Sequence, residues 1–109
     1  EVGVDLIDVS SGGLVHDAKI VTGPGYQVGF AAEIKNGSKI MTSAVGQIND
    51  PTQAEDIIKN KNIDAVMIGR QMLRNPRWAI GAAEELGEKI SWSVQLERAR
   101  KLGARKSPQ

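Results

Sequence analysis

The sequence predicts an α/β fold built on parallel strands, and three observations support this prediction. Short β-branched, apolar segments alternate with helix-like segments three times along the 109 residues. Each apolar segment ends at a glycine-bearing turn, and the connections are mostly short. Strands and helices that alternate in this way are joined by right-handed crossovers, so the strands run parallel in one sheet. Three such strands leave both sheet edges unpaired, so we expect this sheet to be part of a larger one.

Hydrophobic patterns and turn residues define the predicted elements. In order, they are a buried strand over 4–9, a long loop rich in glycine and proline, a helix over about 27–36, a strand over 39–45, a helix over 51–60, a strand over 65–68, a helix over 76–86, a helix over 94–102 and a basic flexible tail over 103–109. Asp50 as N-cap, Pro51 in the first turn and Gln53 as a capping-box residue predict the helix over 51–60. Asn75 and Pro76 predict the next helix in the same way.

Composition excludes several kinds of site and partner. The chain is 40% hydrophobic and 25% charged, which is typical of a soluble globular domain. Its formal charge of +1 indicates neither nucleic acid nor an anionic membrane as partner. Without cysteine, and with His16 as its one histidine, the chain is not expected to bind a metal. No apolar run reaches the roughly 18 residues that span a bilayer, so we expect a cytoplasmic protein.

Glycine-bearing turns follow all three predicted strands at one edge of the sheet. Gly46 follows the second strand, and Gly69 and Arg70 follow the third. Glycine lets the backbone approach a phosphate, and Arg70 would add a full positive charge. Turns between strands and helices also favour glycine for geometric reasons, and the sequence contains neither GxGxxG nor a P-loop. A phosphate site and simple turn geometry therefore remain alternative interpretations of these glycines.

Four blocks of sequence together resemble one known family. They are VDLIDVSSGGLVH at 4–16, PGYQV at 24–28, AVG at 44–46 and IGRQMLRNP at 68–76. In this order they resemble the C-terminal third of old yellow enzymes, in the bacterial NADPH dehydrogenase or ene-reductase branch. The resemblance implies that residues 1–109 are the C-terminal part, about the last three βα units, of a (β/α)₈ TIM barrel that binds FMN. The first residue is not methionine, which also leads us to expect a piece of a longer chain.

The resemblance also implies roles for individual residues at the cofactor. Ser10 would contact the flavin, whereas Gly46, Gly69 and Arg70 would hold the FMN phosphate. No catalytic residue is expected in this chain, because the family's substrate-binding histidine pair and its tyrosine proton donor lie in upstream segments.

Tyr26 and Arg98 are the candidates for contact with the substrate. Tyr26 lies in a turn where it could line the substrate entrance or pack under the long loop. Arg98 lies in a segment similar to the family's C-terminus, in which an arginine reaches into the active site of a neighbouring subunit. The segment departs from the family pattern, because Leu96 replaces the usual aromatic residue and the chain continues beyond the arginine. A solvated helix is the alternative interpretation for Arg98, and Trp78 and Trp92 fit helix packing or an interface.

The implied activity is that of an FMN-dependent NADPH dehydrogenase or ene-reductase, with an activated alkene as substrate and NADPH as reductant. This chain would supply the FMN phosphate site, would be inactive on its own, and would belong to a homo-oligomer when complete. One alternative is a tRNA dihydrouridine synthase-like FMN barrel, against which the near-neutral charge argues. The other is a non-catalytic phosphate-binding scaffold fragment that pairs with another chain through its open sheet edges.

Overall fold

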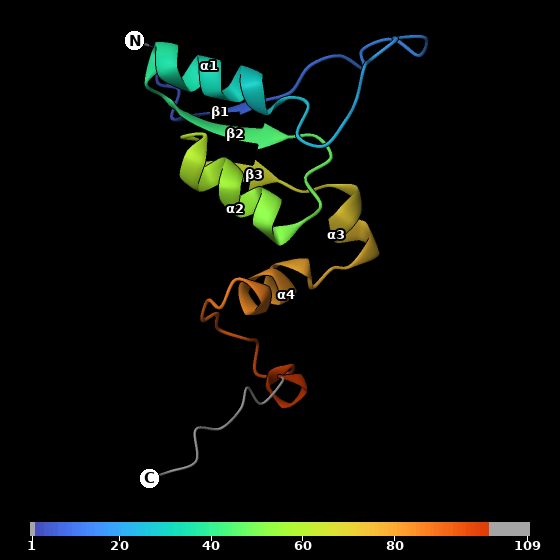
Figure 1. The fold of residues 1–109 in the computed structure, drawn as a ribbon, viewed down its shortest axis with the longest axis vertical. Coiled ribbons are helices and arrows are strands. Elements are labelled where there is room, and N and C mark those ends of the chain that lie inside the picture. Colours follow the sequence, from blue (N-terminus) through green and yellow to red (C-terminus); the bar gives the residue numbers. More distant parts are fainter. Residues whose placement is uncertain (1, 101–109) are drawn as a thin grey trace.

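The computed structural model describes residues 2–100, which form a three-stranded parallel sheet with helices (Figure 1). In chain order, the elements are β1 (Leu6–Val9), α1 (Val28–Ser38), β2 (Met41–Val45), α2 (Pro51–Asn60), β3 (Ala65–Met67), α3 (Arg70–Arg74), α4 (Trp78–Glu85) and a 3₁₀ turn at Glu97–Ala99. The strands pair in the order β1-β2-β3, and both pairings are parallel. The predicted α/β class is therefore confirmed. Within the described residues, no helix has the length and apolar character needed to cross a membrane.

The hydrophobic core lies on one face of the sheet, and the other face is open. Val9 and Ala44 are buried in a cluster that includes Ile57 of α2. Successive strand residues point to opposite faces. On the opposite face Leu6 and its cross-strand neighbour Met41 are 41% and 48% exposed, whereas Ser43 of β2 is buried and donates its hydroxyl to Asp8 at 2.6 Å. The predicted burial of the first strand is therefore found at Val9 but not at Leu6 or Asp8, because the packed helices cover only one side of it.

Helix α2 begins at the predicted residue and has the predicted cap. A side-chain oxygen of Asp50 accepts hydrogen bonds from the N–H groups of Thr52 at 2.9 Å and Gln53 at 3.1 Å. The Gln53 side chain accepts from the N–H of Asn49 at 3.1 Å and donates to the carbonyl of Gln47 at 3.2 Å. The Gln53 side chain therefore bonds to the turn between β2 and α2, one residue before the N–H of Asp50 that a capping box would use.

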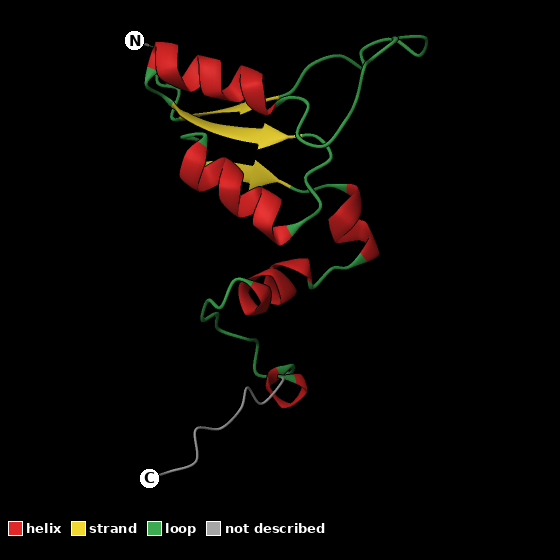
Figure 2. Cartoon of the chain, in the orientation of Figure 1, coloured by secondary structure: helices red, strands yellow, loops and turns green. Residues whose placement is uncertain are grey.

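Several predicted boundaries differ by a few residues, and one helix was missed. The strands are shorter than predicted, α1 extends to residue 38, and α4 covers 78–85 within the predicted 76–86 (Figure 2). The segment 70–74, for which no element was predicted, forms α3. This helix has only five residues, which is too short for a hydrophobic period to be recognised in the sequence.

The helix predicted over 94–102 is wrong. In the described part of this segment, up to residue 100, only the 3₁₀ turn at 97–99 is helical. Helices in proteins are stabilised mainly by packing an apolar face, and Val94 is 84% exposed. The tail predicted over 103–109 lies outside the described residues.

Asp64 connects α1 to the sheet and should make stability depend on pH. Its carboxylate accepts hydrogen bonds from the ammonium of Lys35 at 2.7 Å and from the N–H of Thr42 at 2.9 Å. These two bonds lower the pKa of the Asp64 carboxyl from its usual value, and the bond from Lys35 has the larger effect. A lowered pKa in the folded state contributes stability above the unfolded-state pKa, and this contribution is lost as pH falls through the folded-state pKa.

We therefore expect Asp64→Asn in the complete protein to lower the midpoint of thermal unfolding at neutral pH. The difference from the unchanged protein should shrink as pH falls and disappear once the carboxyl is protonated in both states. Thermal unfolding followed at a series of pH values measures this. Asp17→Asn, in the exposed loop after β1, is the control and should shift the midpoint at no pH. A midpoint difference for Asp64→Asn that is the same at all pH values would contradict the assignment.

Candidate functional site

A pocket of about 450 Å³ lies at the carboxyl ends of β2 and β3. The three strand arrows point the same way, and the loop after β1, the turn after β2 and α3 all lie beyond their tips (Figure 1). Three segments line the pocket: Tyr26 and Gln27 before α1, the end of β2 with the turn after it (residues 45–49), and four residues from the end of β3 to the end of α3, which are Met67, Gly69, Arg70 and Arg74. The carboxyl edge of a parallel sheet is where such folds place their ligands.

The structure brings four of the predicted site residues together and leaves two outside. Gly46, Gly69, Arg70 and Tyr26 all line the pocket. Ser10 is the exposed residue immediately after β1 and does not line it. The other residue outside the pocket, Arg98, is exposed in the 3₁₀ turn, which lies far from the strand tips (Figure 1).

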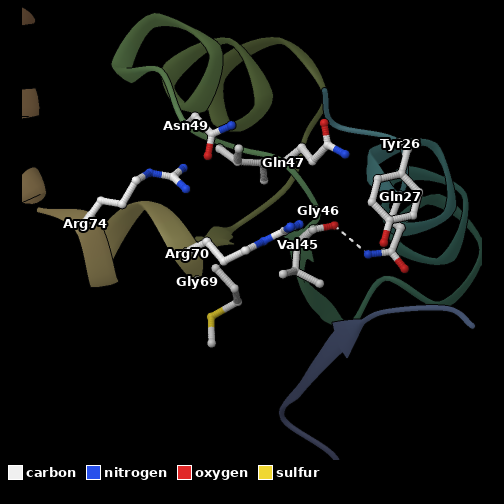
Figure 3. A pocket seen from close by; sticks show the side chains of 11 residues that line it. Tyr26, Gln27, Val45, Gly46, Gln47, Asn49, Gly69, Arg70 and Arg74 are labelled. Carbon is white, nitrogen blue, oxygen red and sulfur yellow. Dashed lines mark hydrogen bonds between the residues drawn. The ribbon is translucent and has the colours of Figure 1, made fainter. Parts of the chain in front are cut away.

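Two arginines give the pocket a positive character. In Figure 3 the guanidinium of Arg70 extends from α3 toward the turn at Gly46, and that of Arg74 extends toward Asn49. The Arg74 guanidinium donates to the side-chain oxygen of Gln71 at 3.0 and 3.1 Å, which holds its position. None of the described lining residues is aspartate or glutamate, and neither arginine forms an ion pair within residues 2–100. Guanidinium groups without a carboxylate partner favour an anionic ligand such as a phosphate.

The backbone at Gly46 has a conformation that excludes other residues. Its φ is +126°, and an added Cβ would lie 2.6 Å from the Tyr26 ring and 3.0 Å from the Gln27 side chain. The carbonyl of Gly46 accepts a hydrogen bond from the N–H of Gly25 at 2.9 Å, which holds the turn before α1 against it. Turn geometry and close packing thus account for this glycine, whatever ligand the pocket binds.

Gly69 differs from Gly46 in its surroundings. An added Cβ at Gly69 would meet no described atom within 4 Å, so the backbone there faces open space at the wall of the pocket. A ligand can therefore approach the main chain at Gly69 next to the Arg70 side chain.

Sequence reasoning missed several residues of this pocket, among them Gln27 and Arg74. Gln27 was assigned only to the start of a helix, although it lies in the PGYQV block and is 2% exposed. Arg74 follows Arg70 by four residues, a spacing that places both on one side of a helix, but the signal is usable only once α3 is known. Trp78, predicted for packing, packs against the core and donates its indole N–H to the carbonyl of Asn49 at 2.8 Å.

Comparison with known proteins identifies similar sequences over most of the chain. A sequence model described as the NADH:flavin oxidoreductase / NADH oxidase family matches residues 1–89. An NADPH dehydrogenase of Geobacillus sp. (strain WCH70) is 55% identical over 98 residues, which cover 90% of this chain and 28% of the relative. An NADPH dehydrogenase of Bacillus pumilus (strain SAFR-032) is 52% identical over 99 residues, 91% of this chain and 29% of the relative. The chain therefore spans between a quarter and a third of the length of these relatives.

Proposed function

Because the chain belongs to the NADH:flavin oxidoreductase / NADH oxidase family, we propose that it is part of an FMN-dependent NADPH oxidoreductase that reduces activated alkenes. The family match also confirms the predicted resemblance to old yellow enzymes. The proposed role of the chain is to supply the phosphate end of the FMN site. The observation that carries this proposal is the pocket at Gly46 and Gly69, which Arg70 and Arg74 line without a carboxylate partner among residues 2–100. The isolated chain is expected to be inactive, because it contains no residue assigned to proton transfer.

The residues of the pocket fit the phosphate group of FMN. Arg70 and Arg74 offer planar donor groups that match phosphate oxygens, and the open space beside Gly69 lets a phosphate reach the backbone. The Tyr26 ring packs beside Gly46 and remains the candidate contact for substrate.

The bound flavin would supply the hydride-transfer chemistry, from NADPH to the β-carbon of an alkene conjugated to an electron-withdrawing group. The residues of this chain hold and orient it. Arg70, Gly46 and Gly69 anchor the phosphate at the edge of β2 and β3, and an anchor at one end restricts where the ring system can lie. Ser10, exposed at the end of β1, is placed at the same sheet edge and is proposed to contact the ring system.

We also propose that the three strands belong to a (β/α)₈ barrel. In such a barrel, helices cover the outer face and strand side chains fill the interior. The one-sided helix cover and the exposed Leu6 and Met41 on the other face agree with this arrangement. The complete enzyme is proposed to be a cytoplasmic homo-oligomer in which Arg98 reaches the active site of a neighbouring subunit.

The absorbance spectrum of the complete protein, purified from its natural source, tests the proposed function. We expect flavin bands that bleach when NADPH is added without oxygen and return when cyclohexenone is added. If the bands bleach but return only with oxygen, the protein binds flavin and is reduced by NADPH, but the proposed reduction of alkenes is wrong. A colourless protein that also takes up no added FMN would overturn the proposal.

A further inference from the structure

Gln27 is a buried polar residue in the wall of the pocket. It immediately precedes α1, but its side chain does not cap that helix, and the residue is only 2% exposed. A buried amide without hydrogen-bond partners would lower stability. The partners of its side chain therefore explain why a glutamine can occupy this position.

The side-chain amide of Gln27 joins the ends of two strands. Its oxygen accepts hydrogen bonds from both the N–H and the hydroxyl of Ser11, the latter at 2.9 Å. Its nitrogen donates to the carbonyl of Val45 at 2.8 Å (Figure 3). Ser11 lies just after β1, and Val45 is the last residue of β2. The register between these strands ends at the pair of Val9 and Ala44, so Gln27 continues the connection beyond the last paired residues.

The nitrogen end of this amide also lies against the turn at Gly46. A Cβ added at Gly46 would come within 3.0 Å of the Gln27 nitrogen. The side chain thus contacts the backbone before Gly46 and limits the space beside it. The turn after β1 and the turn after β2 are held at a fixed separation by one side chain.

We propose that Gln27 is a positioning residue that fixes the turn after β1 relative to the turn at Gly46 and thereby shapes the pocket for the FMN phosphate. The inference rests on the proposed function, because it takes FMN as the ligand. Both ends of the amide are needed. The oxygen satisfies the donors of Ser11, and the nitrogen satisfies the carbonyl of Val45, so a side chain with acceptors only would leave this carbonyl facing another oxygen.

Gln27→Glu in the complete protein tests the requirement for a donor. A protonated carboxyl keeps an acceptor oxygen and one O–H donor, which is all that the bond to Val45 needs, whereas a carboxylate has acceptors only. We measure the FMN dissociation constant by quenching of flavin fluorescence between about pH 5 and about pH 8. At each pH, the ratio of the variant's dissociation constant to that of the unchanged protein is taken, because this ratio removes the effect of the titration of the FMN phosphate itself. The ratio should be near one in acid and rise roughly tenfold as the introduced carboxyl ionises.

Two further variants separate this effect from a general loss of packing. Gln27→Ala should weaken FMN binding by a ratio that does not change with pH. Gln95→Glu makes the same chemical change at an exposed residue outside the pocket, and its ratio should stay near one. A ratio for Gln27→Glu that is flat across the pH range would overturn the positioning role.

Hydrogen exchange gives a second measurement that does not depend on the flavin. Gln27→Ala should speed exchange at the amide of Ser11 and in the turn after β2, compared with the unchanged protein. If the unchanged protein binds no FMN, the proposed function fails, and exchange alone then decides the role of Gln27. Unchanged exchange in both turns would overturn the inference, whereas faster exchange in both would support it.

Discussion

Arg70→Ala in the complete protein is expected to weaken FMN binding roughly 30-fold or more, while riboflavin, which lacks the phosphate, should bind nearly as before. The guanidinium of Arg70 extends toward the Gly46 turn and has no ion pair within residues 2–100 (Figure 3). A hydrogen bond to a charged group contributes about 1.5–3 kcal/mol, and 2 kcal/mol is about 30-fold in a dissociation constant. Titrations of FMN and riboflavin by fluorescence quenching measure both affinities.

Three further variants define the specificity of this result. Arg77→Ala removes the same charge from an exposed residue outside the pocket and should leave both affinities unchanged. Arg70→Lys keeps the charge but loses the planar donor fork, so its loss should be smaller than that of Arg70→Ala. Arg74→Ala should also cost less, because that guanidinium shares its donors with Gln71. Equal losses of FMN and riboflavin binding in Arg70→Ala would mean that the arginine does not bind the phosphate.

Gly46→Ala is expected to lower the stability of the complete protein by about 2 kcal/mol or more and to weaken FMN binding as well. The φ of +126° is one that other residues rarely adopt, and the new Cβ would lie 2.6 and 2.9 Å from two atoms of the Tyr26 ring. The main chain beside the ring is held against the Gly46 turn, because the N–H of the adjacent Gly25 is bonded to the Gly46 carbonyl at 2.9 Å. Thermal unfolding and the FMN content of the purified protein are the measurements.

A matched glycine separates the effect of the site from that of any added methyl group. Gly37 lies inside α1, its φ is not positive, and an added Cβ there would meet no described atom within 4 Å. Gly37→Ala should therefore leave the stability unchanged or raise it by about 0.5–1 kcal/mol. Adding Tyr26→Ala to Gly46→Ala should recover the part of the loss that comes from the close contact, but not the part that comes from the backbone. A Gly46→Ala protein as stable as the Gly37→Ala protein would refute the argument.

Local signals in the sequence account for most of the fold that is observed. Asp50 and Gln53 predict the start of α2 because capping residues act on N–H groups within three positions. Prediction fails where the decisive contacts are not local. The segment 94–102 has helical composition, but in its described part nothing packs against Val94, so a helix is not stabilised there.

The candidate site also contains residues that the sequence could predict and residues that it could not. Gly46, Gly69 and Arg70 could be placed together from the sequence, because the carboxyl ends of successive parallel strands must meet at one edge of the sheet. Arg74 could not be added to them, because its orientation depends on α3, whose five residues show no period. The role of Gln27 was also hidden, because its partners lie 16 and 18 positions away in the chain.

The sequence by itself determined the family, the parallel arrangement of the strands and the edge at which a ligand can bind, since each follows from motifs or from periods of a few residues. Only the tertiary structure decided which side chains meet at that edge. It placed the Tyr26 ring against Gly46, directed two arginines of α3 toward the same pocket, and set Gln27 between two strand ends. These contacts join segments that lie far apart in the sequence, and they depend on distances in space that no local pattern encodes.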